Sequence, residues 1–373
     1  MIKLQPAMAQ ALKLTRSGNL QEATRLIQAS LRGQAAPATA PSSEAEIVVG
    51  LKAQRIALPK PETLRQPNAK RQPEPAKASG KARRTTTGRF EERSYTGPEG
   101  AMTYWLYLPA GVSPGMPLVV MLHGCTQNPQ DFARGTAMNA LADEMGFIAA
   151  YPCQPAAANA QKCWNWFKPS DQQRGRGEPA MIAAVTQQVV RDHAADPARV
   201  YVAGLSAGGA AAAIMGAAYP DVYAAIGVHS GLACGSADSM WSAFAAMRSG
   251  SAKPSTVEGG GTFVPVITFH GDSDTTVHAV NSAQIVAEAA RRSDIALASR
   301  TEKGKSAGNR TYSRTISSGP DGVPVIEEWT IHGAGHAWSG GDASGSYTDA
   351  SGPDASRAML TFFLQHSLNL AAR

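Results

Sequence analysis

The stretch that decides the fold is Val200–Gly209, VYVAGLSAGG, where a serine stands between two glycines. An apolar, β-branched run precedes the serine and predicts a buried strand, and an alanine-rich run follows it and predicts a helix. The pattern Gly204-x-Ser206-x-Gly208 is typical of a strand-to-helix turn so tight that a Cβ at either glycine would clash. Such a turn exposes the serine hydroxyl at a helix N-terminus, where the N–H of Ala207 and the helix dipole favour a developing negative charge. The sequence therefore predicts a nucleophile at Ser206.

Runs of the same kind recur on both sides of this turn. Apolar stretches predict strands at 102–111, 117–124, 147–152, 199–206, 224–231, 264–274 and 325–333. Helical patterns occupy 178–194, 283–293 and 354–368, the last with Asp354 near its start. Alternating strands and helices predict a doubly wound, mostly parallel sheet. Combined with the serine turn, this predicts an α/β-hydrolase domain over 89–373.

A serine hydroxyl is a poor nucleophile without a base and an orienting acid. In α/β-hydrolases these follow in the chain order serine, acid, histidine. Asp272 and Asp274 lie beyond the apolar run that ends near residue 271; Asp274 completes an H-G-x-x-D pattern and is preferred, with Asp272 as the alternative. His336 lies in a glycine-rich loop and is the expected base, whereas His332 is expected to be structural. The predicted triad is Ser206, Asp274 and His336.

The oxyanion of such a reaction needs two backbone donors. One is the N–H of Ala207, after the nucleophile. The other is expected in the loop LHGCTQN, 122–128, most simply from Cys125, with Thr126 as the alternative. His123 in the same loop is expected to stabilise the loop. These donors and the triad predict attack on an ester carbonyl, an acyl-enzyme and its hydrolysis.

The net charge of +6 is confined to one segment. Between residues 33 and 89 there are eleven Lys/Arg and four Glu, a surplus of 11 − 4 = +7, so the rest of the chain carries about −1. This distribution gives no reason to expect nucleic-acid binding.

Residues 33–88, with seven prolines, are expected to form a flexible linker, and residues 1–32 are expected to form a helical hairpin that docks on its own domain or on a partner. No apolar run is long enough to span a bilayer, and the N-terminus does not resemble a signal peptide.

The four cysteines are Cys125, Cys153, Cys163 and Cys234. Two disulfides and four reduced thiols are both compatible with the sequence alone. No CxxC pair occurs, and no carboxylate or cysteine cluster accompanies His332 and His336. We therefore expect no metal site.

Four separate motifs carry a resemblance to a known family. The motifs at 122–133, 163–182, 199–210 and 333–341 together resemble the poly(3-hydroxybutyrate) depolymerase-type esterases, a group that includes feruloyl and acetylxylan esterases. The resemblance runs from about Arg89 to the C-terminus. It implies the same triad, no cofactor, and an ester or polyester substrate. Many members are secreted, so the resemblance implies an extracellular enzyme, while the lack of a recognisable signal peptide leaves the cytoplasm as the alternative.

Further expectations concern the surroundings of the triad. Trp164, Trp166 and Trp338 are expected to form an aromatic rim for the substrate or, alternatively, to pack beneath the loops. A hypothetical Cys125–Cys163 disulfide would hold the loop of Trp164 and Trp166 beside the loop 122–128, which we call the oxyanion loop. Cys153–Cys234 would be the second disulfide.

Two other functions stay open besides a hydroxyalkanoate esterase. A feruloyl or acetylxylan esterase uses the same chemistry, and a non-catalytic scaffold is the alternative of another class. The presence of all three triad residues favours an enzyme.

Overall fold

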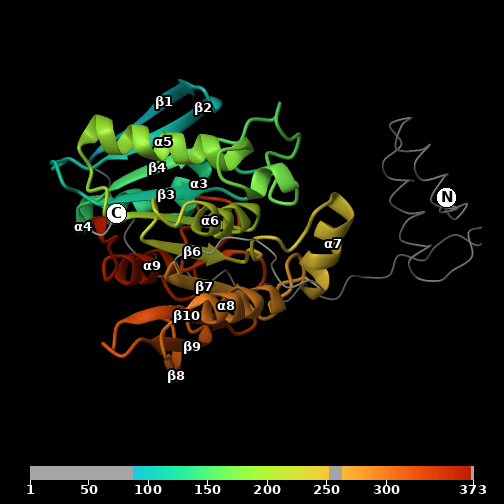
Figure 1. Ribbon diagram of the computed structural model, residues 1–373. Helices are drawn as coiled ribbons and strands as arrows, with labels where there is room; N and C mark the ends of the chain where they lie inside the picture. Colours follow the sequence, from blue (N-terminus) through green and yellow to red (C-terminus); the bar gives the residue numbers. More distant parts are fainter. Residues whose placement is uncertain (1–86, 252–262, 371–373) are drawn as a thin grey trace, which may run out of the picture. The chain divides into compact units, whose positions relative to one another are not determined.

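A computed structural model describes residues 87–251 and 263–370 (Figure 1). The predicted hairpin at 1–32 and nearly all of the predicted linker at 33–88 lie outside the described residues. The first strand begins at Arg89. The described residues form one ten-stranded sheet with the strand order β1-β2-β4-β3-β5-β6-β7-β10-β9-β8, and a separate pair, β11 and β12.

The ten strands of the large sheet are, in chain order, β1 (Arg89–Gly97), β2 (Gly100–Leu108), β3 (Leu118–Leu122), β4 (Ile148–Pro152), β5 (Val200–Leu205), β6 (Ala225–His229), β7 (Val266–Gly271), β8 (Ala298–Lys305), β9 (Thr311–Ser318) and β10 (Pro324–Ile331). The small pair consists of β11 (Trp338–Ser339) and β12 (Thr348–Asp349). The strands from β4 to β10 in the sheet order run parallel to one another.

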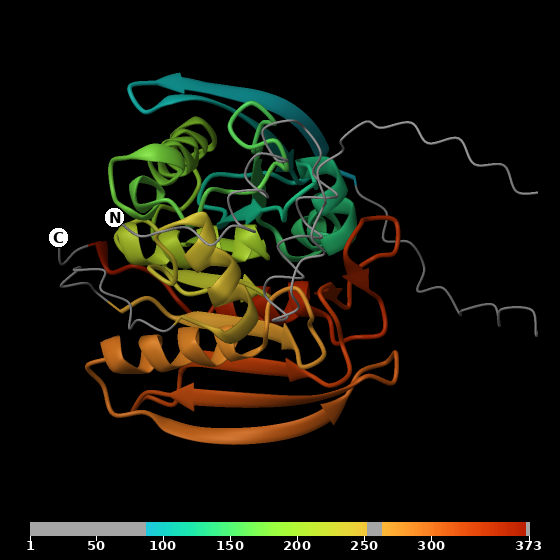
Figure 2. The same cartoon turned by 90° about the vertical axis from the view of Figure 1, so that its right-hand side faces the viewer.

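Both edges of the sheet are antiparallel. The β1–β2 hairpin pairs with β4, and β9 and β8 extend the sheet beyond β10. Figure 2 shows the β1–β2 hairpin (cyan) and the β8–β9 pair (orange) at opposite ends of the described part. The predicted mostly parallel sheet is therefore confirmed, while β1, β8 and β9 were not predicted.

Helices cover both faces of the sheet. They are α3 (Pro129–Thr136), α4 (Met138–Met145), α5 (Gly177–His193), α6 (Ala207–Ala218), α7 (Met240–Ser249), α8 (Val280–Arg292), α9 (Ala355–Phe363) and the short 3-10 helix η1 (Pro169–Gln172). None of these described helices is both long and apolar enough to cross a membrane.

Two hydrophobic layers hold the helices to the sheet. One layer contains side chains of α5, α6 and α8, such as Ile182, Ile214 and Ile285. The other contains side chains of α3, α4 and α9, such as Phe132 and Phe363. Strands β3 to β7 are buried along their whole length, because helices cover both of their faces.

The parallel topology brings five loops to one edge of the sheet. β3, β5, β6, β7 and β10 are consecutive neighbours in the sheet, so the loops after their carboxyl ends emerge side by side. Ligands of open α/β sheets bind at this edge. These loops carry the residues that the sequence singles out.

Candidate active site

Ser206 lies on a turn that only glycines on either side permit. Its backbone has φ 58° and ψ −119°, a sparsely populated conformation for a residue with a side chain. A Cβ on Gly204 would lie 2.2 Å from the carbonyl oxygen of Gly208, and one on Gly208 would lie 2.0 Å from that of Leu122. The serine N–H donates to the His229 carbonyl at 2.9 Å, which ties the turn to the neighbouring strand β6.

The loop after β3 lies against this turn. A Cβ built on Gly124 would be 3.7 Å from the Cβ of Ser206, so the backbone of this loop closely approaches the serine. The Gly124 N–H donates to the side-chain oxygen of Gln127 at 2.9 Å. A disulfide joins Cys125 to Cys163, as expected, and links this loop to the segment before η1.

The two expected oxyanion donors are the backbone N–H groups of Cys125 and Ala207. Among the residues that the structure describes, neither the Cys125 nor the Ala207 N–H donates a hydrogen bond. Ala207 is the first residue of α6, where the backbone N–H groups of a helix are unpaired and the dipole is positive. The alternative donor, Thr126, is engaged, because its N–H donates to the Gln161 carbonyl at 2.7 Å.

His336 and Asp274 form a close pair. The His336 Nδ1 lies 2.6 Å from Asp274 Oδ2, and the aspartate side chain is fully buried. Burial would raise the pKa of Asp274, but hydrogen bonds with His270 and His336 and from the Val277 N–H hold that pKa well below its usual range. Asp274 is therefore ionised at neutral pH. It accepts the N–H groups of Thr276 and Val277 at 2.8 and 2.9 Å, which fix its orientation.

The alternative acid, Asp272, belongs to a second pair. Its Oδ2 lies 2.9 Å from His332 Nδ1, its Oδ1 accepts the Gly333 N–H at 2.7 Å, and His332 Nε2 lies 2.9 Å from Ser313 Oγ. Ser313 lies within β9 between two paired strands, not at a helix N-terminus. Across the described ranges, no group of three or more His, Cys, Asp or Glu side chains is arranged to hold a metal ion.

His229 is a residue that sequence reasoning missed. Its carbonyl accepts the Ser206 N–H, and its Nε2 accepts the Ser339 N–H at 2.9 Å. Its ring stacks on Trp338 with centroids 5.0 Å apart. Burial lowers the pKa of His229 well below its usual value, so the ring is neutral. Through its main-chain carbonyl and its side chain, this one residue connects the serine turn to the segment that follows His336.

The three tryptophans expected at the substrate rim are buried instead. Trp164, Trp166 and Trp338 are 0%, 7% and 1% exposed, so the rim expectation is wrong and the packing alternative describes them. The Trp164 Nε1–H donates to the His123 carbonyl at 3.0 Å, which ties Trp164 to the loop after β3. The sequence does not reveal this, because the burial of an aromatic ring depends on which loops close over it.

The second expected disulfide is not formed. Cys153 and Cys234 are both free. Cys153 directly follows β4 and Cys234 follows β6, and β3 and β5 lie between these strands. Three strand spacings of about 4.8 Å amount to roughly 14 Å, well beyond the reach of a disulfide of about 7 Å between Cα atoms.

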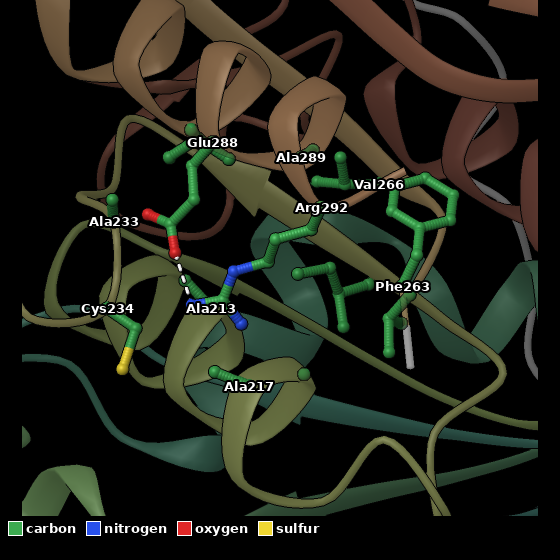
Figure 3. A pocket seen from close by; sticks show the side chains of 13 residues that line it. Ala213, Ala217, Ala233, Cys234, Phe263, Val266, Glu288, Ala289 and Arg292 are labelled. Carbon is green, nitrogen blue, oxygen red and sulfur yellow. Dashed lines mark ion pairs between the residues drawn. The ribbon is translucent and has the colours of Figure 1, made fainter. Parts of the chain in front are cut away.

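A cavity of about 60 Å³ lies away from these residues (Figure 3). It lies between α6 and α8 and is lined mostly by apolar side chains, among them Ala213, Ala217 and Phe263. Its polar lining includes the ion pair of Glu288 and Arg292, 2.7 Å apart. None of the predicted triad residues lines it.

Comparisons with known proteins agree with the resemblance. The chain is 33% identical over 247 residues to poly(3-hydroxyalkanoate) depolymerase C of Paucimonas lemoignei, covering 64% of this chain and 58% of that protein. It is 34% identical over 134 residues to feruloyl esterase B of Thermothelomyces thermophilus, covering 36% of this chain and 45% of that protein. The chain thus spans about half the length of these two relatives.

A solved structure shares the fold. The acetyl xylan esterase from Aspergillus awamori superposes with a TM-score of 0.61 at 21% identity, covering 74% of this chain and all of that one. The family model described as esterase PHB depolymerase matches residues 102–308, more than half of the chain. The chain therefore belongs to the PHB depolymerase family of esterases.

Proposed function

We propose that the protein is a serine carboxylic-ester hydrolase that cleaves short-chain hydroxyalkanoate esters or polyesters. The observation that carries the proposal is the strained turn that presents Ser206 at the N-terminus of α6, next to the loop of Gly124 and Cys125. The pair of His336 and the buried Asp274 supports the base and acid of a triad.

Acylation begins with attack of the Ser206 Oγ on the ester carbonyl carbon while His336 Nε2 takes the hydroxyl proton. Asp274 accepts the Nδ1–H of His336, which fixes the tautomer and stabilises the imidazolium. The backbone N–H groups of Cys125 and Ala207 stabilise the oxyanion. Collapse of the tetrahedral intermediate breaks the C–O bond, and the imidazolium protonates the departing alcohol.

Deacylation repeats these steps with water. His336 removes a proton from water, the resulting nucleophile attacks the acyl carbon, and the acid leaves as Ser206 regains its proton. No step in this sequence requires a cofactor.

Similarity to a named depolymerase supports a hydroxyalkanoate substrate. The match to the Paucimonas lemoignei protein covers more of this chain than the match to the feruloyl esterase does. Feruloyl or acetyl esters of plant polysaccharides are the second candidate, favoured by the likeness to the Aspergillus awamori fold. A non-catalytic scaffold is the alternative of another class. Ester turnover that is lost in Ser206→Ala would exclude it.

We propose an extracellular location. The Cys125–Cys163 disulfide supports it, because disulfides persist in oxidising compartments and are rare in the cytoplasm.

The test compares the hydrolysis of p-nitrophenyl esters, from acetyl to octanoyl, by the wild type and by Ser206→Ala, with a suspension of poly(3-hydroxybutyrate) in parallel. We expect Ser206→Ala to lower kcat by about three to six orders of magnitude without unfolding the protein. Ser313→Ala is the matched control, because Ser313 also contacts a histidine–aspartate pair, and it should keep wild-type kcat.

The other outcomes separate the candidates. Clearing of the suspension together with turnover of short esters supports the depolymerase. Turnover without clearing favours small or carbohydrate-linked esters. Equal rates for the wild type and Ser206→Ala would show that Ser206 is not the nucleophile and would favour the non-catalytic scaffold.

A further inference from the structure

One large aromatic side chain next to the candidate site is exposed. Tyr347 is 47% exposed, unlike the three buried tryptophans. Its hydroxyl lies 3.1 Å from the Oγ1 of Thr126, although 221 positions separate the two residues. Thr126 directly follows Cys125, the proposed oxyanion donor. The exposed ring therefore lies beside the oxyanion loop.

Both residues of this contact have an unusual backbone. Tyr347 has φ 52° and Thr126 has φ 66°, in the left-handed region that favours glycine. For a bulky or β-branched residue this conformation is unfavourable, and it persists where the surroundings enforce it. Two such residues in contact indicate a geometry that the fold maintains.

The residue before Tyr347 is held by a network of hydrogen bonds. Ser346 accepts hydrogen bonds from the Gln127 Nε2, and both its N–H and its hydroxyl donate to Asp131. Gln127 is 2% exposed and also accepts the Gly124 N–H, so the network reaches the backbone beside Ser206. The position of Tyr347 is thereby coupled to that of the oxyanion loop.

The backbone of Tyr347 also contacts the segment that carries the base. Its carbonyl accepts the Trp338 N–H at 2.7 Å, and Trp338 lies two residues after His336. Tyr347 therefore bridges the oxyanion loop through its side chain and the His336 segment through its main chain. The first segment approaches Ser206, and the second is linked to the serine turn through His229.

We propose that Tyr347 is a specificity-determining residue whose exposed ring contacts the apolar part of the ester beside the oxyanion loop. The proposal rests on the proposed esterase function. The aromatic face supplies apolar contact area, and the hydroxyl bond to Thr126 fixes the ring before substrate arrives. The ring favours esters that extend beyond an acetyl group, such as butanoyl esters and 3-hydroxybutyrate oligomers.

The kinetic test uses Tyr347→Ala, Tyr347→Phe and the exposed Trp241→Ala on α7 as matched control. Tyr347→Ala should raise KM for p-nitrophenyl butanoate and hexanoate about tenfold, leave KM for the acetate within twofold, and change kcat little. Tyr347→Phe keeps the ring and should stay within about threefold of wild type. Alanine has a Cβ, as tyrosine does, so the left-handed backbone at this position stays as unfavourable as in the wild type. Glycine would relieve it and so change the stability.

A binding test keeps this proposal separate from the esterase function. The dissociation constant of a 3-hydroxybutyrate trimer methyl ester is measured for Ser206→Ala and for Ser206→Ala/Tyr347→Ala, with thermal unfolding to establish that both are folded. We expect about tenfold weaker binding in the double variant. Equal binding overturns the proposal even if the wild type is an esterase, and weaker binding supports it even if ester turnover fails.

Two kinetic results would also overturn the proposal. A fall in kcat with unchanged KM would mean that Tyr347 only orders the oxyanion loop. Equal effects of Tyr347→Phe and Tyr347→Ala would mean that the hydroxyl bond to Thr126 matters and the ring contact does not.

Discussion

Two aspartates two positions apart differ in their surroundings. Asp272 is half-exposed and pairs with the half-exposed His332, whereas Asp274 is buried and pairs with His336. The sequence predicts Asp274 from its spacing but leaves Asp272 open. The partner of each aspartate depends on how the loop after β10 folds over the end of β7, where a Cβ on Gly271 would lie 2.3 Å from the Ala334 carbonyl oxygen. No pattern in the sequence predicts that these two segments lie so close together.

At this scale we predict unequal effects of Asp274→Asn and Asp272→Asn. Asp274→Asn should lower kcat by about 10³- to 10⁴-fold, because the amide cannot hold His336 in the required tautomer. Asp272→Asn should lower kcat by less than about tenfold, because it loosens contacts to Ser273, His332 and Gly333, which lie outside the proposed triad. The comparison is made on p-nitrophenyl butanoate at pH 8. A larger fall for Asp272→Asn would exchange the two roles.

Single residues also show where sequence reasoning ends. His229 connects Ser206 to the segment after His336 only because β6 lies next to β5, and the sequence does not give the strand order. The burial of Trp338 follows from the same packing, since its ring stacks on His229 and contacts Phe132. The motifs therefore predict which residues belong to the candidate site, and the tertiary packing decides which of them are buried and which are exposed.

Secondary-structure elements were predicted best where helices cover both faces. The buried parallel strands are continuous apolar runs, so β3, β5 and β7 stand out in the sequence. β8 has the sequence ASRTEKGK and is exposed along nearly its whole length, so it lacks both an apolar run and a buried face. It is a strand because it forms a hairpin with β9, which follows it directly along the chain and in turn pairs with β10.

The disulfide between the oxyanion loop and the segment before η1 gives a prediction at the scale of elements. Two free thiols are expected in the denatured, unreduced protein, from Cys153 and Cys234. In the native protein Cys153 should react first with a thiol reagent, because it is partly exposed, whereas Cys234 is buried and burial raises the pKa of Cys234 to about 12. Thiol titration before and after denaturation measures both. Four free thiols, or none, would contradict the observed pairing.

At the scale of the whole molecule, the sheet gathers the loops of distant segments at one edge, and buried histidines support these loops. Burial lowers the pKa of His123 to about 4. Its Nδ1 lies 2.8 Å from the Gly124 carbonyl and its Nε2 accepts the Gln154 N–H, so the neutral form is bound on both sides. Protonation would break the second contact.

This burial predicts an acid-dependent stability. An unfolded histidine titrates near pH 6.5, so the unfolded state binds more protons than the folded state between about pH 6.5 and 4. The stabilisation is complete above that range and is lost as the pH falls through it. His123 alone should lower the free energy of unfolding by about 2 kcal/mol between pH 7 and pH 5.

Urea unfolding of the wild type at both pH values measures the total change, and the NMR titration of His123 assigns its share. The exposed His278→Gln variant is the matched control and should show the wild-type dependence. A His123 that titrates near pH 6.5 in the folded protein would remove this explanation.

The two outer strands have a consequence for how copies of the molecule meet. An unpaired sheet edge is a template for a strand of another chain, and charged side chains prevent that pairing. β8 presents Arg300, Glu302 and Lys303, and β1 presents Arg89 and Glu91, mostly exposed. A second sheet that added at either edge would have to desolvate these charges. The charges on both outer strands of the described sheet therefore disfavour edge-to-edge pairing with a strand of another copy.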